Sequence, residues 1–468
     1  MLFNSLDFGL VLALTVAAWR LARGRGRVVV LLVASYLLYG AWNPAFLLLL
    51  VFSTVLDYGV GLAMERVEGR DGSRRWRRAL LAASLVGNLG VLFFFKYRHF
   101  FLASIGLGDW SLVDPGGAFH VYGSIPPGLS FYTFQTLSYT IDVYRGTTRP
   151  CRNPVDFALY VSFFPQLVAG PVVRADEFLP QLEKPPRPSA QATVQAVELF
   201  TLGLVKKVVI ADNLGRAVDR VFADPSGWNA WSIAAAALLF WVQVYCDFSA
   251  YSTMARGLGR LFGFHLPRNF DYPILASNPL EYRQAWHKTM SAWFRDYVFH
   301  PLGGSRRRPL RVAVNILIVW ALFGLWHGAA WTFVAWGLYN GVIQATYREM
   351  LRRGWTLPAF PGKRWAGVAL NIGLMIPSAV AFRAPSTTSG LGALGTMFSF
   401  TTQGASLPLH WLVVLAGLGA VHVLAWRFYD ENLLWRLSWP GRVAVLAGAT
   451  LLVAVLAPPE RPFIYFQF

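Results

Sequence analysis

The sequence predicts an all-α polytopic membrane protein. Of its 468 residues, 55% are hydrophobic and only 14% are charged, whereas soluble globular domains carry roughly 25% charged residues. Apolar stretches close to the twenty residues needed to cross a bilayer recur along the whole chain. The stretches between them are all shorter than a folded domain of about 50 residues. We therefore expect a single membrane-embedded unit that spans residues 1–468.

The apolar stretches predict about ten to twelve transmembrane helices, because a helix needs roughly 17–25 apolar residues to span the bilayer. Some segments are short enough to be re-entrant instead. The segments fall at residues 7–22, 28–43, 44–64, 78–95, 127–144, 154–172, 191–211, 228–246, 309–327, 329–347, 363–382, 408–427 and 441–457.

The positive charges indicate how the chain is oriented. Arginines cluster at residues 20–27 and 66–78, after the first and third apolar segments. By the positive-inside rule both loops are cytoplasmic, which places the N-terminus outside the cytoplasm. The net charge of +18 lies between apolar stretches, whereas a nucleic-acid binder would display it on a soluble surface. We expect contact with membrane lipid and not with nucleic acid, and no cleavable signal peptide at residues 1–7.

Two segments differ from ordinary spans. Residues 154–171 contain Pro165 and Gln166 in the middle of an apolar stretch, and non-helical backbone at membrane depth is tolerated only inside protein or beside a cavity. Gln166 is therefore a candidate for contacting substrate, with a structural plug as the alternative. Residues 281–302 are too charged to span, but aromatic and apolar side chains recur there at helical spacing. This pattern predicts one amphipathic helix that lies in the interface or packs against the bundle.

His327 is the strongest candidate for a functional residue. It lies inside residues 312–347, a run of 36 residues without Asp, Glu, Lys or Arg, and an ionisable group inside hydrocarbon is costly. The run is too long for one helix across about 30 Å, so it must turn or break. Gly324 and Gly328 flank the histidine, where the backbone could loosen. A buried neutral imidazole can act as a general base; a hydrogen-bonded structural histidine is the alternative.

Other familiar catalytic patterns do not occur in the sequence. There is no Gly-x-Ser-x-Gly elbow, no phosphate-binding glycine loop and no His-Glu-x-x-His pair. The two cysteines, Cys151 and Cys246, lack metal-ligand spacing. We therefore expect neither a metal site nor a disulfide framework. His287, forty residues before His327, would by spacing alone be a polar edge residue of the amphipathic helix.

Several motifs together resemble the membrane-bound O-acyltransferase family, in particular its bacterial branch that takes part in alginate O-acetylation. The resemblance covers essentially the whole chain. The motifs lie at residues 35–42, 127–135, 142–146, 163–171, 247–249, 283–287, 293–297, 301–304, 325–331, 382–384 and 462–466.

The resemblance implies a helical barrel with funnels from both membrane faces, and a catalytic core at about residues 240–345. His327 would occupy the family's catalytic position and His287 its second, more variable polar position. The implied donor is a cytoplasmic thioester such as acetyl coenzyme A, with no bound cofactor. The implied acceptor is an exported polysaccharide, reached directly or through an extracytoplasmic transferase partner. The implied location is the bacterial inner membrane.

We expect His327 to deprotonate the acceptor and His287 to help hold the developing oxyanion. Trp286, Trp326 and Asn315 are further candidates for contacting substrate, although Asn315, like Asp247, has a helix contact as its alternative role. Asn340 stands where many family members have a histidine, which argues against a proton relay there.

The sequence is also compatible with two other functions. One is transfer of D-alanine or another acyl group from a carrier protein. The other is a proton-coupled transporter or flippase of an acylated carrier, with His327 as the coupling site.

Arg295 and Asp296 are adjacent and are expected to pair with each other.

Overall fold

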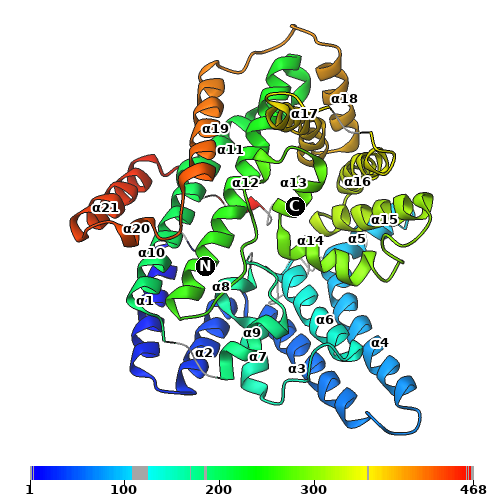
Figure 1. Cartoon of the computed structure of the whole chain (residues 1–468), viewed down its shortest axis with the longest axis vertical. Coiled ribbons are helices and arrows are strands. Elements are labelled where there is room, and N and C mark those ends of the chain that lie inside the picture. Colours follow the sequence, from blue (N-terminus) through cyan, green and yellow to red (C-terminus); the bar gives the residue numbers. More distant parts are fainter. Residues whose placement is uncertain are drawn as a thin grey trace. The chain divides into compact units, whose positions relative to one another are not determined.

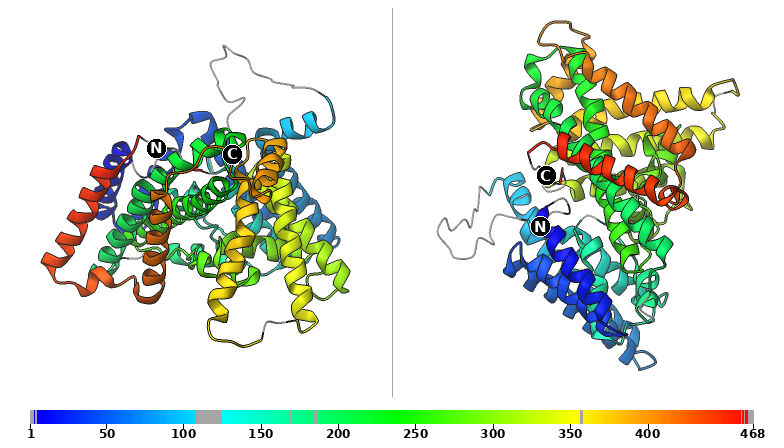
Figure 2. Two further views of the ribbon diagram at one scale, coloured as in Figure 1. Left: turned by 90° about the horizontal axis from the view of Figure 1, so that it is seen from above. Right: turned by 90° about the vertical axis from the view of Figure 1, so that its left-hand side faces the viewer.

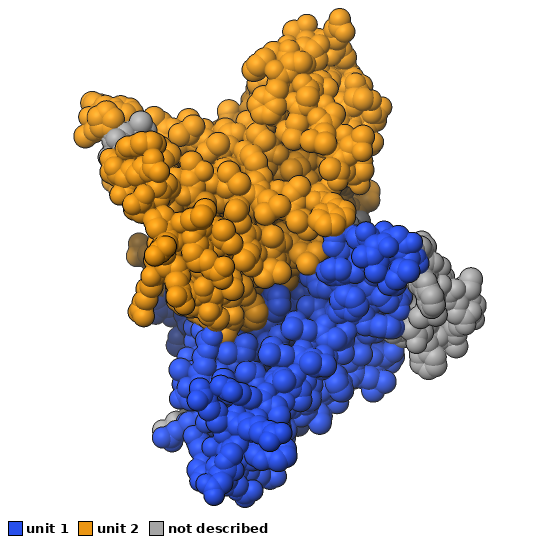
Figure 3. Space-filling model, turned by 90° about the vertical axis from the view of Figure 1, so that its right-hand side faces the viewer, with its two compact units in different colours: residues 1–200, 254–267 blue, residues 201–253, 268–468 orange. Residues whose placement is uncertain are grey.

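The computed structural model describes residues 3, 5–107, 125–168, 170–183, 187–355, 358–459, 461, 463 and 464. The segment between the expected spans at 78–95 and 127–144 lies outside the described residues at positions 108–124. So do Ala169 of the motif at 163–171 and Pro462, Tyr465 and Phe466 of the motif at 462–466. The described residues divide into two compact units (Figure 3). Unit 1 comprises residues 1–200 and 254–267, and unit 2 comprises residues 201–253 and 268–468.

The fold is helical throughout, as the sequence predicts (Figure 1). Within the described residues the only β-type pairing is an isolated bridge between Trp228 and Ala405. The helices that begin in unit 1 are α1 Leu6–Leu21, α2 Gly26–Gly40, α3 Pro44–Arg66, α4 Ser73–Leu92, η1 Phe93–Tyr97, α5 Arg98–Ser104, α6 Leu129–Arg145, α7 Pro154–Ser162, α8 Phe164–Leu167, α9 Ala175–Glu183 and α10 Ala190–Leu204.

The helices that begin in unit 2 include α12, which passes into unit 1 after Thr253. They are η2 Val205–Ala211, α11 Asp212–Ala223, η3 Pro225–Gly227, α12 Ala230–Leu261, η4 Pro273–Leu275, α13 Pro279–Ala285, α14 Lys288–Phe294, η5 Arg295–Phe299, α15 Pro309–His327, α16 Trp331–Arg352, α17 Lys363–Arg383, α18 Thr387–Phe398, α19 His410–Phe428, α20 Leu433–Arg436 and α21 Trp439–Leu456.

Seven helical segments of the described chain are long and apolar enough to cross a membrane. Other expected spans form helices that are shorter, such as the 16 residues of α1, the 15 of α2 and the 17 of α6. At 1.5 Å per residue a 16-residue helix covers about 24 Å, less than the hydrocarbon core. The seven long segments are Pro44–Arg66, Ser73–Ser104, Ala230–Leu261, Pro309–His327, Lys363–Arg383, His410–Phe428 and Trp439–Leu456.

In unit 1 the apolar segment at residues 154–172 is interrupted, as the sequence predicts. α7 ends at Ser162 and α8 begins at Phe164, with Pro165 in its first turn, where no backbone N–H is needed. The backbone N–H of Phe164 donates to Ser35 Oγ on α2 over 3.1 Å. The side chains around this break are buried, so the irregular backbone is enclosed by protein.

A buried carboxylate joins three helices of unit 1. Asp57 of α3 accepts hydrogen bonds from Ser84 and Asn88 of α4 and from Thr140 of α6. Its side chain is fully buried. A carboxylate inside an apolar span is tolerated when polar groups on neighbouring helices satisfy it, so this cluster fixes the packing of α3, α4 and α6.

In unit 2 the uncharged run forms a helical hairpin, which confirms that the run breaks. α15 ends at His327 and α16 begins at Trp331. The two helices approach backbone to backbone: a Cβ atom on Gly324 would lie 2.1 Å from Phe333 O, and one on Gly337 would lie 2.2 Å from Trp320 O. α17 packs along the other side of α16 (Figure 2).

The prediction of a single amphipathic helix over residues 281–302 is wrong. α13 ends at Ala285, His287 takes a left-handed conformation with φ 41°, and α14 begins at Lys288. The expected apolar face is nevertheless buried at all four positions, Trp286, Met290, Trp293 and Tyr297. The break arises because a neighbouring loop supplies the backbone hydrogen bonds that a continuous helix would have made internally.

Candidate active site

His327 is the last residue of α15, at the turn of the hairpin in unit 2. Its side chain is only 4% exposed. Four aromatic rings surround the imidazole, all near edge-to-face, with interplanar angles of 69° to 88°. We call them the aromatic cage. Its members, with their centroid distances from the imidazole, are Phe323 at 5.0 Å, Trp326 at 4.7 Å, Trp336 at 5.0 Å and Phe382 at 5.1 Å.

Three helices build this cage. Phe323 and Trp326 come from α15, Trp336 from α16 and Phe382 from α17. The close contact at Gly324 and Gly337 brings α15 and α16 near enough for their rings to meet around one imidazole. Edge-to-face packing holds aromatic rings in defined orientations. The imidazole is therefore held in place by apolar walls.

His287 is also fully buried, which corrects the expectation of a polar edge residue. Its ring lies 4.6 Å from Phe248, 5.6 Å from Trp326 and 6.2 Å from Phe270, the last nearly parallel at 7°. Burial among these rings lowers the pKa of His287 to about 3, because a low-dielectric environment disfavours the charged form. His287 is thus neutral at physiological pH.

Trp326 contacts both histidines. Its indole centroid lies 5.6 Å from His287 and 4.7 Å from His327. The structure therefore brings together three of the residues selected from the sequence. Two buried imidazoles thus share one aromatic neighbour.

A loop at residues 268–272 holds the turn that carries His287. The carbonyl of Asn269 accepts from the backbone N–H of Lys288 over 2.8 Å, and Asn269 Oδ1 accepts from both the N–H and the hydroxyl of Thr289. Asn269 Nδ2 donates to Ser252 Oγ of α12 over 3.1 Å. These bonds satisfy the free N–H groups at the start of α14, where a helix has no internal acceptors.

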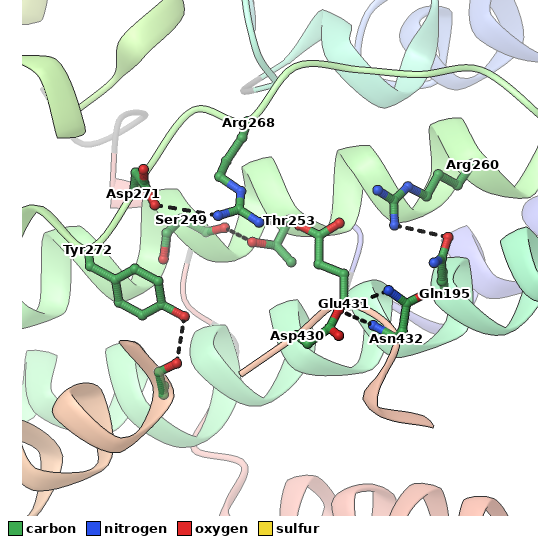
Figure 4. Close-up of polar contacts among 11 residues, drawn as sticks. Gln195, Ser249, Thr253, Arg260, Arg268, Asp271, Tyr272, Asp430, Glu431 and Asn432 are labelled. Atoms are coloured by element: carbon green, nitrogen blue, oxygen red, sulfur yellow. Dashed lines mark hydrogen bonds and ion pairs between the residues drawn. The ribbon is translucent and has the colours of Figure 1, made fainter. Parts of the chain in front are cut away.

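The same loop also contacts the end of α19 and the residues that follow it (Figure 4). Arg268 pairs with Glu431 at 2.6 Å and with Asp271 at 3.4 Å, and the hydroxyl of Tyr272 donates to the carbonyl of Ala425. The loop is thus anchored to the end of α19 and the segment after it. The bonds that reach the turn carrying His287 are those of Asn269.

The other candidate residues have different neighbours. Trp286 lies 5.4 Å from Trp241 and 5.2 Å from Phe270, the ring that also stacks on His287. Asn315 donates to the carbonyl of Leu302 over 3.1 Å. It precedes His327 by twelve residues on one helix, a rise of about 18 Å. Gln166 lies in unit 1, where its amide donates to the carbonyl of Tyr160 over 2.8 Å.

The polar residues named from the sequence mostly have structural partners. Asp247 pairs with Lys207 at 2.9 Å and accepts from the backbone N–H of Ile464, and Arg295 pairs with Asp296 at 2.7 Å. Asn340 donates to Ser378 Oγ over 3.0 Å. In the part of the chain that the structure describes, no three His, Cys, Asp or Glu side chains form a group that could hold a metal ion.

Sequence reasoning missed several residues around the histidines. Trp336 lies in the same uncharged run as His327, but only the hairpin turn brings it back to the imidazole. Phe382 belongs to one of the quoted motifs, and its neighbour Arg383 pairs with Asp219 at 2.8 Å. Asn269 stands in a loop without any periodic pattern, so no sequence signal marked it.

Comparison with known proteins adds the chemistry. A model of the membrane-bound O-acyltransferase family matches residues 151–380. The chain is 37% identical to a probable alginate O-acetylase of Azotobacter vinelandii, over 100% of both chains. It is 35% identical to a peptidoglycan O-acetyltransferase of Helicobacter pylori, over 68% of this chain and 64% of the relative.

A more distant relative is a teichoic acid D-alanyltransferase of Lacticaseibacillus rhamnosus, 24% identical over 57% of this chain and 73% of the relative. The relatives therefore differ in the acyl group and the polymer that their names state. They share acyl transfer, and the seven long apolar helices agree with a multi-pass membrane protein. The chain belongs to the membrane-bound O-acyltransferase family and is an acyltransferase.

Proposed function

We propose that this protein transfers an acetyl group from a cytoplasmic thioester donor, across the bacterial inner membrane, towards an exported polysaccharide. The observation that carries the proposal is the pair of buried imidazoles, His287 and His327, joined by Trp326. The full-length similarity to a probable alginate O-acetylase supports acetyl as the acyl group and a polysaccharide as the acceptor.

His327 is the proposed general base. A ring nitrogen takes the proton of the acceptor hydroxyl, whose oxygen bonds to the thioester carbonyl carbon, and the C=O electron pair moves onto the carbonyl oxygen. As the double bond re-forms, the C–S bond breaks and the thiolate takes the proton back from the imidazolium. A thioester is already activated, so this sequence needs no metal and no covalent protein nucleophile.

His287 is the proposed partner that hydrogen-bonds the donor or acceptor. Its lowered pKa keeps it neutral, and a neutral imidazole can donate from one nitrogen while its other nitrogen accepts. Such a donor can stabilise the oxyanion that forms during the attack. Trp326, Trp286, Asn315 and Gln166 are proposed to contact substrate, with Gln166 on the donor path.

We further propose that residues 1–468 act as one membrane-embedded domain with its N-terminus outside the cytoplasm. In this arrangement the donor enters from the cytoplasmic side, and an extracytoplasmic transferase partner receives the acyl group or delivers it to the polymer. Acetyl coenzyme A is the proposed donor, although other acyl thioesters share the same reactive group.

The experiment is thioester turnover by the purified protein with radiolabelled acetyl coenzyme A. We expect turnover in the wild type and its loss in His327→Ala. His300→Ala is the matched control, because the side chain of His300 is 57% exposed and should be dispensable. Transport of an acylated carrier without donor turnover, retained in His327→Ala, would support the transporter instead and refute the proposal.

A further inference from the structure

We propose that the indole N–H of Trp336 donates a hydrogen bond to the carbonyl oxygen of the acyl group during transfer, which makes Trp336 a catalytic residue. This inference rests on the proposed function and adds to it a second group, beside His287, that stabilises the oxyanion. It starts from the indole nitrogen Nε1 of Trp336, a buried hydrogen-bond donor in the aromatic cage for which the described part of the fold provides no hydrogen-bond partner.

The Nε1 atom of Trp336 is buried and makes no hydrogen bond to any of the described residues. The whole side chain is only 4% exposed. By contrast, Trp241 of the same unit donates from Nε1 to the carbonyl of Met375 over 2.6 Å. Buried N–H groups are nearly always paired in native proteins, so an unpaired one needs an explanation, such as an acceptor that the substrate brings.

The indole of Trp336 is surrounded by aromatic rings, which are not good hydrogen-bond acceptors. Its ring centroid lies 5.1 Å from Phe382, 5.9 Å from Trp320 and 6.2 Å from Phe323. Aromatic rings offer at most weak acceptors to an N–H group. Its main-chain carbonyl is already engaged by Asn340 Nδ2 over 2.8 Å, which holds this turn of α16 in place.

The indole also borders the proposed base. The centroids of Trp336 and His327 lie 5.0 Å apart, with their planes at 82°. A carbonyl group bound beside both rings would place its carbon within reach of the nucleophile that His327 deprotonates. Its oxygen would then lie near an indole N–H, the relation expected between a nucleophile's base and an oxyanion donor.

The chemistry of the indole suits this role. In the attack, the acceptor oxygen bonds to the carbonyl carbon, its proton goes to His327, and the carbonyl oxygen becomes negatively charged. The indole N–H is only a donor, so it stabilises that charge without exchanging a proton. A hydrogen bond from a neutral donor in a buried region strengthens as the charge develops. Its effect therefore falls on kcat more than on KM.

The test is Trp336→Phe, which keeps an aromatic ring in the cage and removes the N–H. We expect kcat for thioester turnover to fall by about 100-fold, with KM within about threefold and the thermal unfolding midpoint lowered no more than in Trp320→Phe, which loses the same buried volume. A second variant carries benzothienylalanine at position 336, which keeps the two-ring shape and lacks only the N–H. It should show the same loss of kcat, and it serves if Trp336→Phe fails to fold.

Trp320→Phe is the matched control, because Trp320 packs against Trp336 and undergoes the same chemical change. We expect it to keep the wild-type kcat. An unchanged kcat in both position-336 variants, or equal losses in Trp336→Phe and Trp320→Phe, would overturn the inference. If His327→Ala is inactive while the position-336 variants are fully active, only the role of Trp336 fails. Full activity in His327→Ala would refute the proposed function itself.

Discussion

The indole of Trp326 lies edge-on to the imidazole of His327, with ring centroids 4.7 Å apart and planes at 69°. The centroid of the same indole also lies 5.6 Å from that of His287. One side chain thus sets the spacing between the two imidazoles that the proposed mechanism uses. Displacements of about 1 Å in such a centre are enough to cost about 100-fold in rate.

Trp326→Phe should therefore reduce kcat by about 10- to 100-fold, because the smaller ring cannot contact both histidines. The measurement is turnover of radiolabelled acetyl coenzyme A, with thermal unfolding to record stability. Trp331→Phe is the control, since Trp331 is 60% exposed at the start of α16. Equal activity in the two variants would show that the spacing of the histidines does not depend on Trp326.

The lowered pKa of His287 predicts a loss of stability in acid. In the folded protein the imidazole stays neutral down to pH about 3, whereas in the unfolded chain it takes up a proton below its ordinary pKa of about 6.5. The contribution of the neutral imidazole to the free energy of unfolding is therefore fully present above pH 6.5 and falls as the pH decreases towards 3. The free energy of unfolding then changes by up to about 1.4 kcal/mol per pH unit.

This dependence can be isolated by comparing wild type with His287→Gln in thermal unfolding at pH 7.5 and pH 5. The wild type should lose more stability between the two values than the variant does. In the wild type the acidic limb of kcat/KM near neutral pH should come from a group other than His287. Equal losses in the two proteins would mean that His287 titrates normally in the folded state.

Asn269 should be a positioning residue for His287. In Asn269→Ala the start of α14 loses the acceptor for Thr289, and capping bonds of this kind contribute about 0.5–2 kcal/mol. We expect kcat to fall at least about 10-fold, and Asn269→Asp, which retains the acceptor oxygens, to recover part of it. Arg268→Gln is the control: its pairing with Glu431 is part-exposed and worth at most about 1 kcal/mol. Activity in Asn269→Ala equal to that of this control would contradict the role.

Close packing at Gly324 should make this position intolerant of any side chain. A Cβ atom there would lie 2.1 Å from the carbonyl oxygen of Phe333, so Gly324→Ala must push α15 and α16 apart. We expect a loss of roughly 1–3 kcal/mol, as for other overpacked sites, together with a loss of turnover. Gly373→Ala in α17 meets nothing within 4 Å and should be neutral or slightly stabilising. Similar behaviour of the two variants would refute the backbone contact.

The buried charge cluster of unit 2 should be important for stability. Lys207 lies 2.7 Å from Asp212 and 2.9 Å from Asp247, and all three side chains are buried. Lys207→Met would leave two carboxylates without their cation and should cost about 3–5 kcal/mol. The exposed pair of Arg152 and Glu65 provides the comparison, since Arg152→Met should cost at most about 1 kcal/mol. Unfolding in denaturant measures both, and equal costs would contradict the prediction.

Much of the fold follows from composition and periodicity. The all-helical architecture, the broken segment around Pro165 and the break beside His327 were all predictable, because each depends on local hydrophobicity and on proline. The number of spans was harder to predict. Short helices such as α2 are as apolar as a spanning helix but do not reach the length of the hydrocarbon core.

The site could be predicted only in part. His327 was recognisable because a lone ionisable group in an uncharged run is unusual. The conformation of His287 was not, because its helix is interrupted where Lys288 and Thr289 donate hydrogen bonds to Asn269, a residue eighteen positions before His287 in an irregular loop. Helical spacing alone therefore favoured a continuous helix. Likewise Phe382 and Trp336 reach His327 only through packing between helices.

The rings of the aromatic cage come from helices that differ in their internal hydrogen bonding. Three of its rings belong to the hairpin of α15 and α16, and only Phe382 comes from a different helix. α17 contains Pro377 one to two turns before Phe382, and a proline inside a helix removes one backbone hydrogen bond and favours bending there. Phe382 is thus the ring of the cage that is carried by a helix with an interrupted hydrogen-bond ladder, whereas the other three rings share the hairpin that carries His327.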